Sequence, residues 1–203
     1  MKKLSIAMFT LFVVLSTATV ARAVPPILRE GTHGMWGAAA MGPLVGVRNA
    51  KFSSGGFTGE AEPPDQFGFF LTFGYHFSGN CNGPAVAIDL QPAFGDDATT
   101  FGIVPKFVWD IRIIPGLGLY LSPMAGLGYA LYVPDCPSGA DCDNWAGLTL
   151  QFGFEGKLII GDRGMVFFRP MHLEFDIMHA PEPLDDFGTF VRYGLMFGGG
   201  AIF

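Results

Sequence analysis

The residues from Phe101 to Ile113 combine large apolar side chains with interleaved charges. The apolar members are Phe101, Ile103, Phe107, Trp109, Ile111 and Ile113, and the charged ones are Lys106, Asp110 and Arg112. Successive side chains of a strand point to opposite faces, whereas an apolar stripe on a helix repeats about every 3.6 residues. The segment therefore predicts a β-strand with one apolar and one charged face.

Similar short apolar segments, separated by Gly, Pro, Asp and Asn, run through the rest of the chain. Together they predict eight strands, at residues 32–47, 66–77, 85–94, 101–113, 116–133, 145–160, 165–178 and 186–203. The register of the first is ambiguous because it is rich in Gly and Ala. The seventh keeps one alternation only if a bulge near Pro170 resets its register, which a proline in a strand permits.

The composition decides what these strands build. Half of the residues are apolar, only 15% are charged, and the mean hydropathy is +0.38. Beyond the first 23 residues no run of 18 apolar residues exists, so no transmembrane helix is predicted. Only helices and closed barrels satisfy every backbone polar group inside a bilayer. The sequence therefore predicts an all-β fold, a closed eight-stranded antiparallel up-and-down transmembrane barrel.

The N-terminus has the pattern of a secretory signal. Lys2 and Lys3 precede an apolar run from Leu4 to Val20, and Ala21-Arg22-Ala23 follows as a cleavage site. We expect residues 1–23 to be removed, leaving residues 24–203 as one barrel domain. No Cys stands directly after the cleavage site, so a lipid anchor is not indicated. A retained N-terminal membrane anchor is the alternative.

The charge argues against one class of partner. The formal net charge is −6, and the predicted signal carries three of the positive charges, so the remainder carries −9. This acidity, without a basic cluster, argues against nucleic-acid binding.

The final segment, DFGTFVRYGLMFGGGAIF, carries a resemblance to a known family. Its outward residues would be Val191, Tyr193, Leu195, Phe197, Ala201 and Phe203. A chain with a signal sequence and an alternating last strand that ends in Phe resembles the small bacterial outer-membrane β-barrels of the OmpA/OmpX-like type. Gly199 and Ala201 are smaller than that family's pattern usually has. The resemblance implies an outer-membrane location, contact with outer-membrane lipid, and a role for Phe203 in the signal that the barrel-assembly machinery recognises.

The connections alternate in length. Residues 48–65, 95–100, 134–144 and 179–186 are polar and predict outer loops, whereas 78–84 and the IPGLG and GDRG segments predict short periplasmic turns. Both termini would then lie in the periplasm. Aromatic belts would follow at the two interfaces, with Tyr75, Phe77, Trp109 and Phe203 on the periplasmic side and Phe101, Tyr129 and Trp145 on the outer side.

Charged residues fall on the inward faces of the predicted strands. They are Asp89, Lys106, Asp110, Arg112, Glu155, Lys157, His172, Glu174, Asp176 and Arg192. An eight-stranded barrel is only wide enough to be filled by its own side chains, and buried ions are costly unless paired. We therefore expect a salt network that plugs the lumen. A proton path, a narrow small-solute pore or a catalytic cluster is the alternative, because ionisable groups inside a membrane suggest function.

The three cysteines suggest one disulfide. Cys136 and Cys142 share a predicted outer loop, and secretion favours a bridge between them. Cys81 is the odd thiol. Asp135, Asp141, Asp143 and Asn144 could bind Ca²⁺, but their spacing is not that of an EF-hand and a solvated acidic loop is the simpler interpretation. We predict no metal and no cofactor.

The sequence favours a structural, adhesive or surface-binding role through the outer loops. In the first loop Arg48, Lys51, Phe52 and Phe57 offer a contact surface, the two Phe being candidate exposed anchors. A lipid-modifying enzyme is the alternative, with His172, Glu174 and Asp176 beside Ser122, but no Gly-x-Ser-x-Gly elbow is present. A soluble lipocalin-type barrel is a third possibility.

Overall fold

The computed structural model describes residues 34–54, 57–78, 82–114, 117–135, 143–161, 163–179 and 187–203. The predicted signal segment and the three cysteines, including the predicted Cys136–Cys142 disulfide, lie outside these residues. Within them, no helix has the length and hydropathy needed to cross a membrane.

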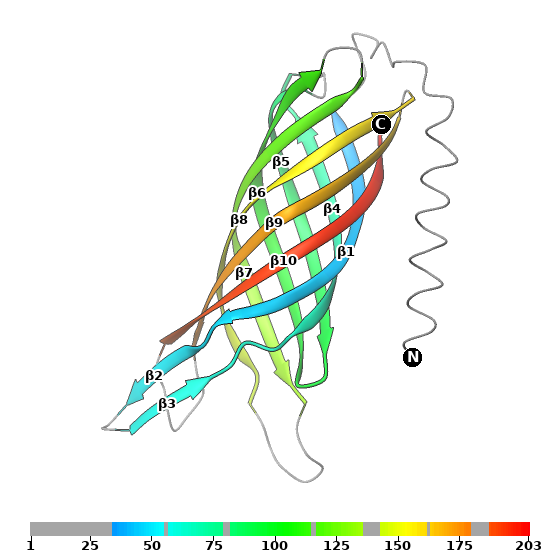
Figure 1. Ribbon diagram of the computed structural model, residues 1–203. Coiled ribbons are helices and arrows are strands. Elements are labelled where there is room, and N and C mark those ends of the chain that lie inside the picture. The colour runs from blue at the N-terminus through cyan, green and yellow to red at the C-terminus, as the bar shows by residue number, and fades with distance from the viewer. Residues whose placement is uncertain are drawn as a thin grey trace, which may run out of the picture.

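Eight long strands form a closed antiparallel barrel (Figure 1). They are β1 (Met35–Arg48), β4 (Gln66–His76), β5 (Gly83–Gly95), β6 (Ala98–Ile114), β7 (Leu119–Pro134), β8 (Trp145–Ile160), β9 (Gly164–His179) and β10 (Phe187–Ile202). Each strand pairs with its neighbour in the chain order, and β10 closes the barrel against β1. The eight-stranded up-and-down fold predicted from the alternation is confirmed.

The closing seam brings the two ends of the domain together. Trp36 pairs with Ile202 and Met41 with Phe197 along β1 and β10. Beyond the last paired residue, the backbone N–H of Phe203 donates to the carbonyl of Met35, 2.8 Å away. We call this end of the barrel the terminus end and the opposite end the mouth.

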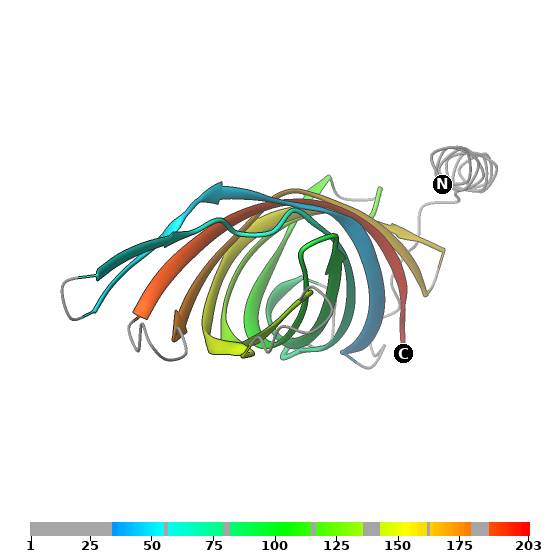
Figure 2. The ribbon, with the colours of Figure 1, turned by 90° about the horizontal axis from the view of Figure 1, so that it is seen from below.

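A small hairpin extends from the mouth. Strands β2 (Ala50–Ser54) and β3 (Phe57–Ala61) pair with each other outside the barrel sheet, to one side of it (Figure 2). The sequence predicted an outer loop over residues 48–65 and no strands within it, so β2 and β3 were missed. The prediction of a longer connection at residues 95–100 is wrong, because only Asp96 and Asp97 separate β5 from β6.

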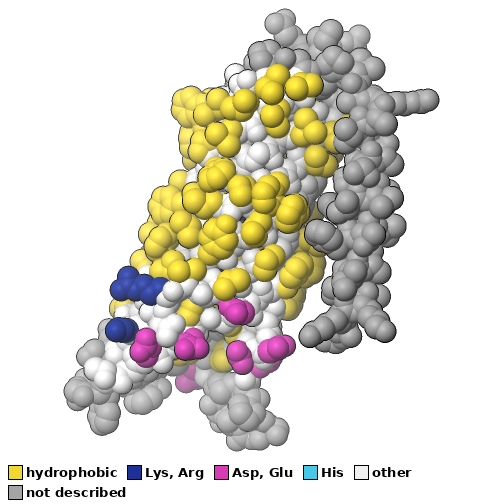
Figure 3. Space-filling view, in the orientation of Figure 1, with side chains coloured by type: hydrophobic (Ala, Val, Ile, Leu, Met, Phe, Trp, Pro, Cys, Tyr) yellow, Lys and Arg dark blue, Asp and Glu magenta, His cyan; other side chains and the backbone are white. Residues whose placement is uncertain are grey.

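The exterior of the barrel is apolar. Strand residues alternate between buried and exposed, and the exposed set includes Phe69 at 41% and Phe107 at 44%. Figure 3 shows apolar side chains covering this face of the barrel, with charged groups gathered at the mouth end. Lys106, Glu155 and Arg192 are instead buried inside. This distribution, apolar outward and charged inward, is the reverse of that in a soluble protein and suits a barrel surrounded by lipid.

Two uncertain registers are settled by the pairing. In β1, Trp36, Ala40 and Leu44 face the interior. In β9, the ladders to both neighbours shift between Phe168 and His172, so the predicted bulge near Pro170 is confirmed. The hydroxyl of Tyr193 donates to the carbonyl of Pro170 at this irregularity.

The aromatic belts agree with expectation except at one residue. Tyr75, Phe77, Trp109 and Phe203 are exposed on strands and turns of the terminus end, and Phe101 and Tyr129 are exposed nearer the mouth. Trp145 is the exception. It shares the inward phase of β8 and packs against Phe52 and Phe190 in the mouth.

Glycine is required where β1 and β10 approach most closely. A Cβ on Gly42 would overlap the carbonyl oxygen of Leu195, in the gap between the Met41–Phe197 and Leu44–Gly194 pairs. The seam can therefore close in this register only with glycine at that position.

We predict that Gly42→Ala destabilises the barrel by about 1–3 kcal/mol, because the added methyl must displace backbone. Urea unfolding of the refolded protein, followed on gels that separate folded from unfolded barrel, measures the change. Gly156→Ala is the matched control, because its Cβ would meet no atom closer than 4.0 Å. Equal midpoints for the two variants would contradict the proposed seam geometry.

Candidate functional site

The barrel interior contains a continuous set of paired polar side chains. Five carboxylates face four Lys or Arg cations and two histidines, and every one of them is at most 6% exposed. They are Asp89, Asp110, Glu155, Glu174, Asp176, Lys106, Lys157, Arg169, Arg192, His76 and His172. We call this set the lumen network and describe it from the terminus end to the mouth.

At the terminus end the network is centred on Asp110 of β6. Its carboxylate accepts from Lys157 Nζ, 2.9 Å from both oxygens, and lies 2.6 Å from His76 Nε2. The Lys157 ammonium also lies 4.9 Å from the ring centre of Trp36 and 3.4 Å from Glu155. Lys157 thus links this end to the centre of the barrel.

In the centre, Asp89 contacts Lys106 and Arg169, and Glu155 contacts Arg169. Lys106 Nζ lies 2.7 Å from Asp89, and Arg169 lies 3.2 Å from Glu155 and 3.8 Å from Asp89. Asp89 also accepts a 2.6 Å hydrogen bond from the hydroxyl of Thr72. Each central charge therefore has an opposite charge in contact.

Toward the mouth, Arg192 of β10 holds the network together. Its guanidinium lies 2.7 Å from Glu174 and 3.1 Å from Asp176, and it donates to Gln66 Oε1 at 2.6 Å. The hydroxyl of Tyr132 donates to Asp176 at 2.8 Å. Glu174 is joined to the central part through His172, whose Nε2 lies 2.8 Å away.

Neutral side chains complete the interior. The amides of Gln91 and Gln151 donate to each other, and Gln151 also donates to Glu174. A cavity of about 10 Å³ remains beside Thr149 and Asp176, room for one water molecule. Among the described residues, the middle of the lumen is therefore filled by side chains.

The structure brings together nine of the ten charged residues selected from the sequence, and it places the tenth elsewhere. Arg112 is exposed at the end of β6, where its guanidinium donates to the hydroxyl of Tyr120 at 3.0 Å. The prediction that Arg112 belongs to the interior network is therefore wrong, because Arg112 lies beyond the last pair of β6 with β5, Asp110–Gly83, where only β7 still pairs with β6. Its backbone N–H donates to the side chain of Asn82.

Sequence reasoning missed two charged members of the network. His76 has the same phase as the inward Thr72 of β4, so the alternation itself contained this signal. Arg169 lies on the far side of the Pro170 bulge, where the phase changes, and only the reset register turns it inward. The amides of Gln66, Gln91 and Gln151 and the phenol of Tyr132 were missed because charge alone was considered.

The contacts of His172 do not match a nucleophile–base pair. Its ring nitrogens lie near Glu174 and Arg169 rather than near Ser122, and the residue is 1% exposed. Among the described residues, no group of three or more His, Cys, Asp and Glu side chains is arranged to hold a metal ion.

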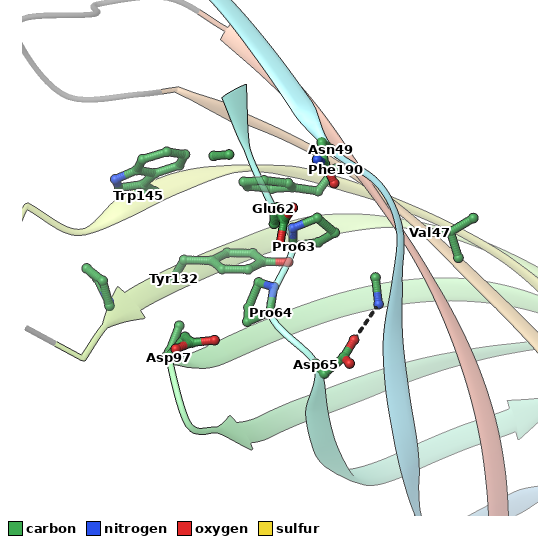
Figure 4. Close-up of a pocket in the computed structure, with 14 residues that line it drawn as sticks. Val47, Asn49, Glu62, Pro63, Pro64, Asp65, Asp97, Tyr132, Trp145 and Phe190 are labelled. Carbon is green, nitrogen blue, oxygen red and sulfur yellow. Dashed lines mark hydrogen bonds between the residues drawn. The ribbon is translucent and has the colours of Figure 1, made fainter. Parts of the chain in front are cut away.

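The mouth contains the second feature of interest, a cavity of about 540 Å³ (Figure 4). The ends of β1, β7, β8 and β10, the segment between β3 and β4, and the turn between β5 and β6 contribute to its lining. Trp145 and Phe190 stack with ring centres 5.9 Å apart, and Phe190 lies 5.6 Å from Tyr132. Glu62, Asp65 and Asp97 also line the cavity.

The hairpin is fixed to this mouth by Phe52. The residue is only 2% exposed and packs edge-on against Trp145, with ring centres 5.3 Å apart. A Cβ on Gly188 would overlap the Phe52 ring, so a glycine on β10 makes this contact possible. The expectation that Phe52 is an exposed binding anchor is therefore wrong, and the side chain of Phe57 lies outside the described residues.

We predict that Arg192→Met destabilises the protein by about 3–5 kcal/mol, because it leaves Glu174 and Asp176 buried without their cation. Chemical unfolding of the protein in lipid vesicles measures the loss. Arg112→Met makes the same chemical change at the exposed end of β6 and should cost far less. Equal losses would show that the interior contacts do not carry the stability assigned to them.

No family model matches the sequence, and no curated protein matches it significantly. The structure is similar to that of Neisserial surface protein A, with a TM-score of 0.58 and 14% identity over 86% of this chain and 100% of that one. The N-terminal β-barrel domain of Pseudomonas aeruginosa OprF has a TM-score of 0.51 and 14% identity, and covers 85% of this chain and 99% of its own. Outer membrane protein OprG from Pseudomonas aeruginosa has a TM-score of 0.51 and 13% identity, over 87% of this chain and 99% of its own. At these identities the similarity shows the fold. Together with the apolar exterior, it shows that the chain has the fold of the small eight-stranded β-barrels of bacterial outer membranes.

Proposed function

We propose that this protein is a surface-binding outer-membrane barrel, whose lumen is closed by its salt network and whose active face is the mouth. The observation that carries the proposal is the contrast along the barrel axis. Among the described residues, the middle of the lumen has a cavity of about 10 Å³, whereas the mouth has one of about 540 Å³.

The orientation of the mouth follows from the barrel habit. In such barrels the termini lie in the periplasm and the longer connections face the outside. Here the hairpin lies at the end opposite Met35 and Phe203, and β7 and β9 end there and β8 and β10 begin there. We therefore assign the mouth to the cell exterior.

The partners follow from the same arrangement. Outer-membrane lipid would surround the apolar exterior, and an extracellular ligand would meet the hairpin and the rim of the mouth. Phe203, which lies just beyond β10 and is 62% exposed, would be accessible to the barrel-assembly machinery.

The other functions considered have less support. A pore would need a continuous path past Arg169 and Arg192, both of which are buried among their carboxylates. A lipid-modifying enzyme would need its nucleophile and base in contact and within reach of lipid, but Ser122 and His172 are buried inside the barrel. A soluble lipocalin-type barrel would not expose this apolar exterior to water.

We predict that the purified protein gives no steady single-channel conductance in planar lipid bilayers, because its own side chains fill the lumen. Arg169→Ala, which removes the largest fully buried side chain, should allow intermittent conductance. Steady conductance of the unmodified protein would contradict the closed lumen and favour a small-solute pore.

The surface role is tested on bacteria that produce the protein. Attachment of these cells to immobilised matrix proteins and to epithelial layers is compared with that of cells producing a variant in which Gly and Ser replace residues 50–61. We expect the variant to remain a folded barrel, shown by heat-dependent gel mobility, and to lose attachment. Equal attachment of producing and non-producing cells would contradict an adhesive role.

A further inference from the structure

The mouth cavity is acidic. Glu62, Asp65 and Asp97 line it, and no Lys, Arg or His is among its lining residues. Asp65 uses one carboxylate oxygen to accept the backbone N–H of Gly46, 2.9 Å away. Figure 3 shows a row of acidic side chains at this end of the barrel, with Lys and Arg side chains to one side of the row. A negative electrostatic field attracts cations and repels anions.

The cavity is also aromatic. Trp145 and Phe190 form its stacked pair, and in the view of Figure 4 Tyr132 lies between that pair and Asp97. Aromatic faces attract cations, and indole does so most strongly. The interior face of Tyr132 already carries Arg192, whose guanidinium carbon lies 5.0 Å from the ring centre. Trp145, which is partly exposed, is therefore the ring best placed to meet a ligand.

The acidic and aromatic lining favours an organic cation over a metal ion as the ligand of the cavity. Ca²⁺ needs six to eight oxygen ligands converging on one point. The described carboxylates of the mouth do not converge in this way, since no group of three is arranged to hold a metal. A ligand that combines positive charge with an apolar body would instead use both the carboxylates and the rings.

We propose that the mouth cavity binds a small organic cation, an ammonium group attached to an apolar body. The ammonium lies between the Trp145 ring and the carboxylates of Glu62 and Asp97, and the apolar body packs beside Pro63 and Pro64. A volume of about 540 Å³ falls within the range of sites for small molecules. This inference deepens the proposed surface-binding role and depends on it for the outward orientation of the mouth.

Isothermal titration calorimetry of the refolded full-length protein with benzyltrimethylammonium tests the proposal. The protein is kept in a glucoside detergent, because a phosphocholine detergent would itself present the proposed cation. Benzyl alcohol serves as the neutral comparator and CaCl₂ as the metal comparator. We expect saturable 1:1 binding of the ammonium compound and none of the two comparators over the same concentration range.

Three variants locate the site. The double variant Glu62→Gln, Asp97→Asn should weaken binding about tenfold or more, and Trp145→Leu, which keeps an apolar contact for Phe52, about fivefold. Asp135→Asn is the matched control: it removes an exposed carboxylate of the same rim that does not line the cavity, and should change affinity less than about twofold.

Four results would overturn the proposal. They are no binding of the ammonium compound, equal binding of benzyl alcohol, displacement of the ammonium compound by stoichiometric Ca²⁺, and equal weakening by Asp135→Asn. None of them bears on attachment of whole cells through the hairpin, so the ligand assignment and the surface role fail separately.

Discussion

A barrel of eight strands in a lipid membrane has to satisfy its interior charges with its own side chains. The lumen is too narrow for bulk water, and the hydrocarbon outside contains no water. An inward carboxylate must therefore pair with a cation from another strand. Asp89 of β5 meets Lys106 of β6, and Glu174 of β9 meets Arg192 of β10. Pairing charges in this way ties neighbouring strands to a single register, because a slip by one residue would turn each charge into the lipid.

The same constraint explains why the two ends of the barrel differ. In the middle of the barrel, the described side chains fill the lumen and neutralise one another's charges, and a cavity of about 10 Å³ lies beside Asp176. Between Tyr132 and the mouth, the strands continue past the lumen network, and their inward faces become aromatic. The hairpin then closes over one side of this region through Phe52, leaving a cavity that is lined rather than filled. A filled lumen and a cavity at the mouth together favour a protein that binds a ligand at its outer surface over one that conducts ions or small solutes.

The sequence predicted the strands well because lipid imposes a strict alternation, and the eight predicted segments correspond to the eight barrel strands. The prediction of which side chains are buried failed at strand ends, at the bulge and in the hairpin, where alternation alone does not determine burial. Arg112 has the inward phase of β6 but lies beyond the point where the barrel encloses it, and a sequence pattern does not contain that boundary. Arg169 is hidden by the bulge that changes its phase. Phe52 lies in a hairpin whose polar composition resembles a loop, and its burial depends on Trp145 and Gly188, which are distant in the sequence.

The contacts of the lumen network could not be predicted for a related reason. Which carboxylate meets which cation depends on the stagger between strands, and the stagger is set by turns and bulges around the whole barrel. Arg192, for example, reaches Gln66 across 126 residues of sequence. The alternation in the sequence predicts which face of each strand carries the members of the network. Which residues pair with one another is determined only by the arrangement of the strands in the closed barrel.

The central claim, a barrel with lipid outside and its charges inside, is tested most directly by tryptophan fluorescence in vesicles of brominated lipid. Trp109 is 48% exposed on the outer face of β6, whereas Trp36 is 4% exposed inside the barrel. Two variants, each with Trp36 or Trp109 as its single tryptophan, should give opposite results. We predict that brominated acyl chains strongly quench Trp109 and leave Trp36 nearly unquenched. Quenching of Trp36 together with protection of Trp109 would show that the apolar face is turned inward, and would contradict this structure.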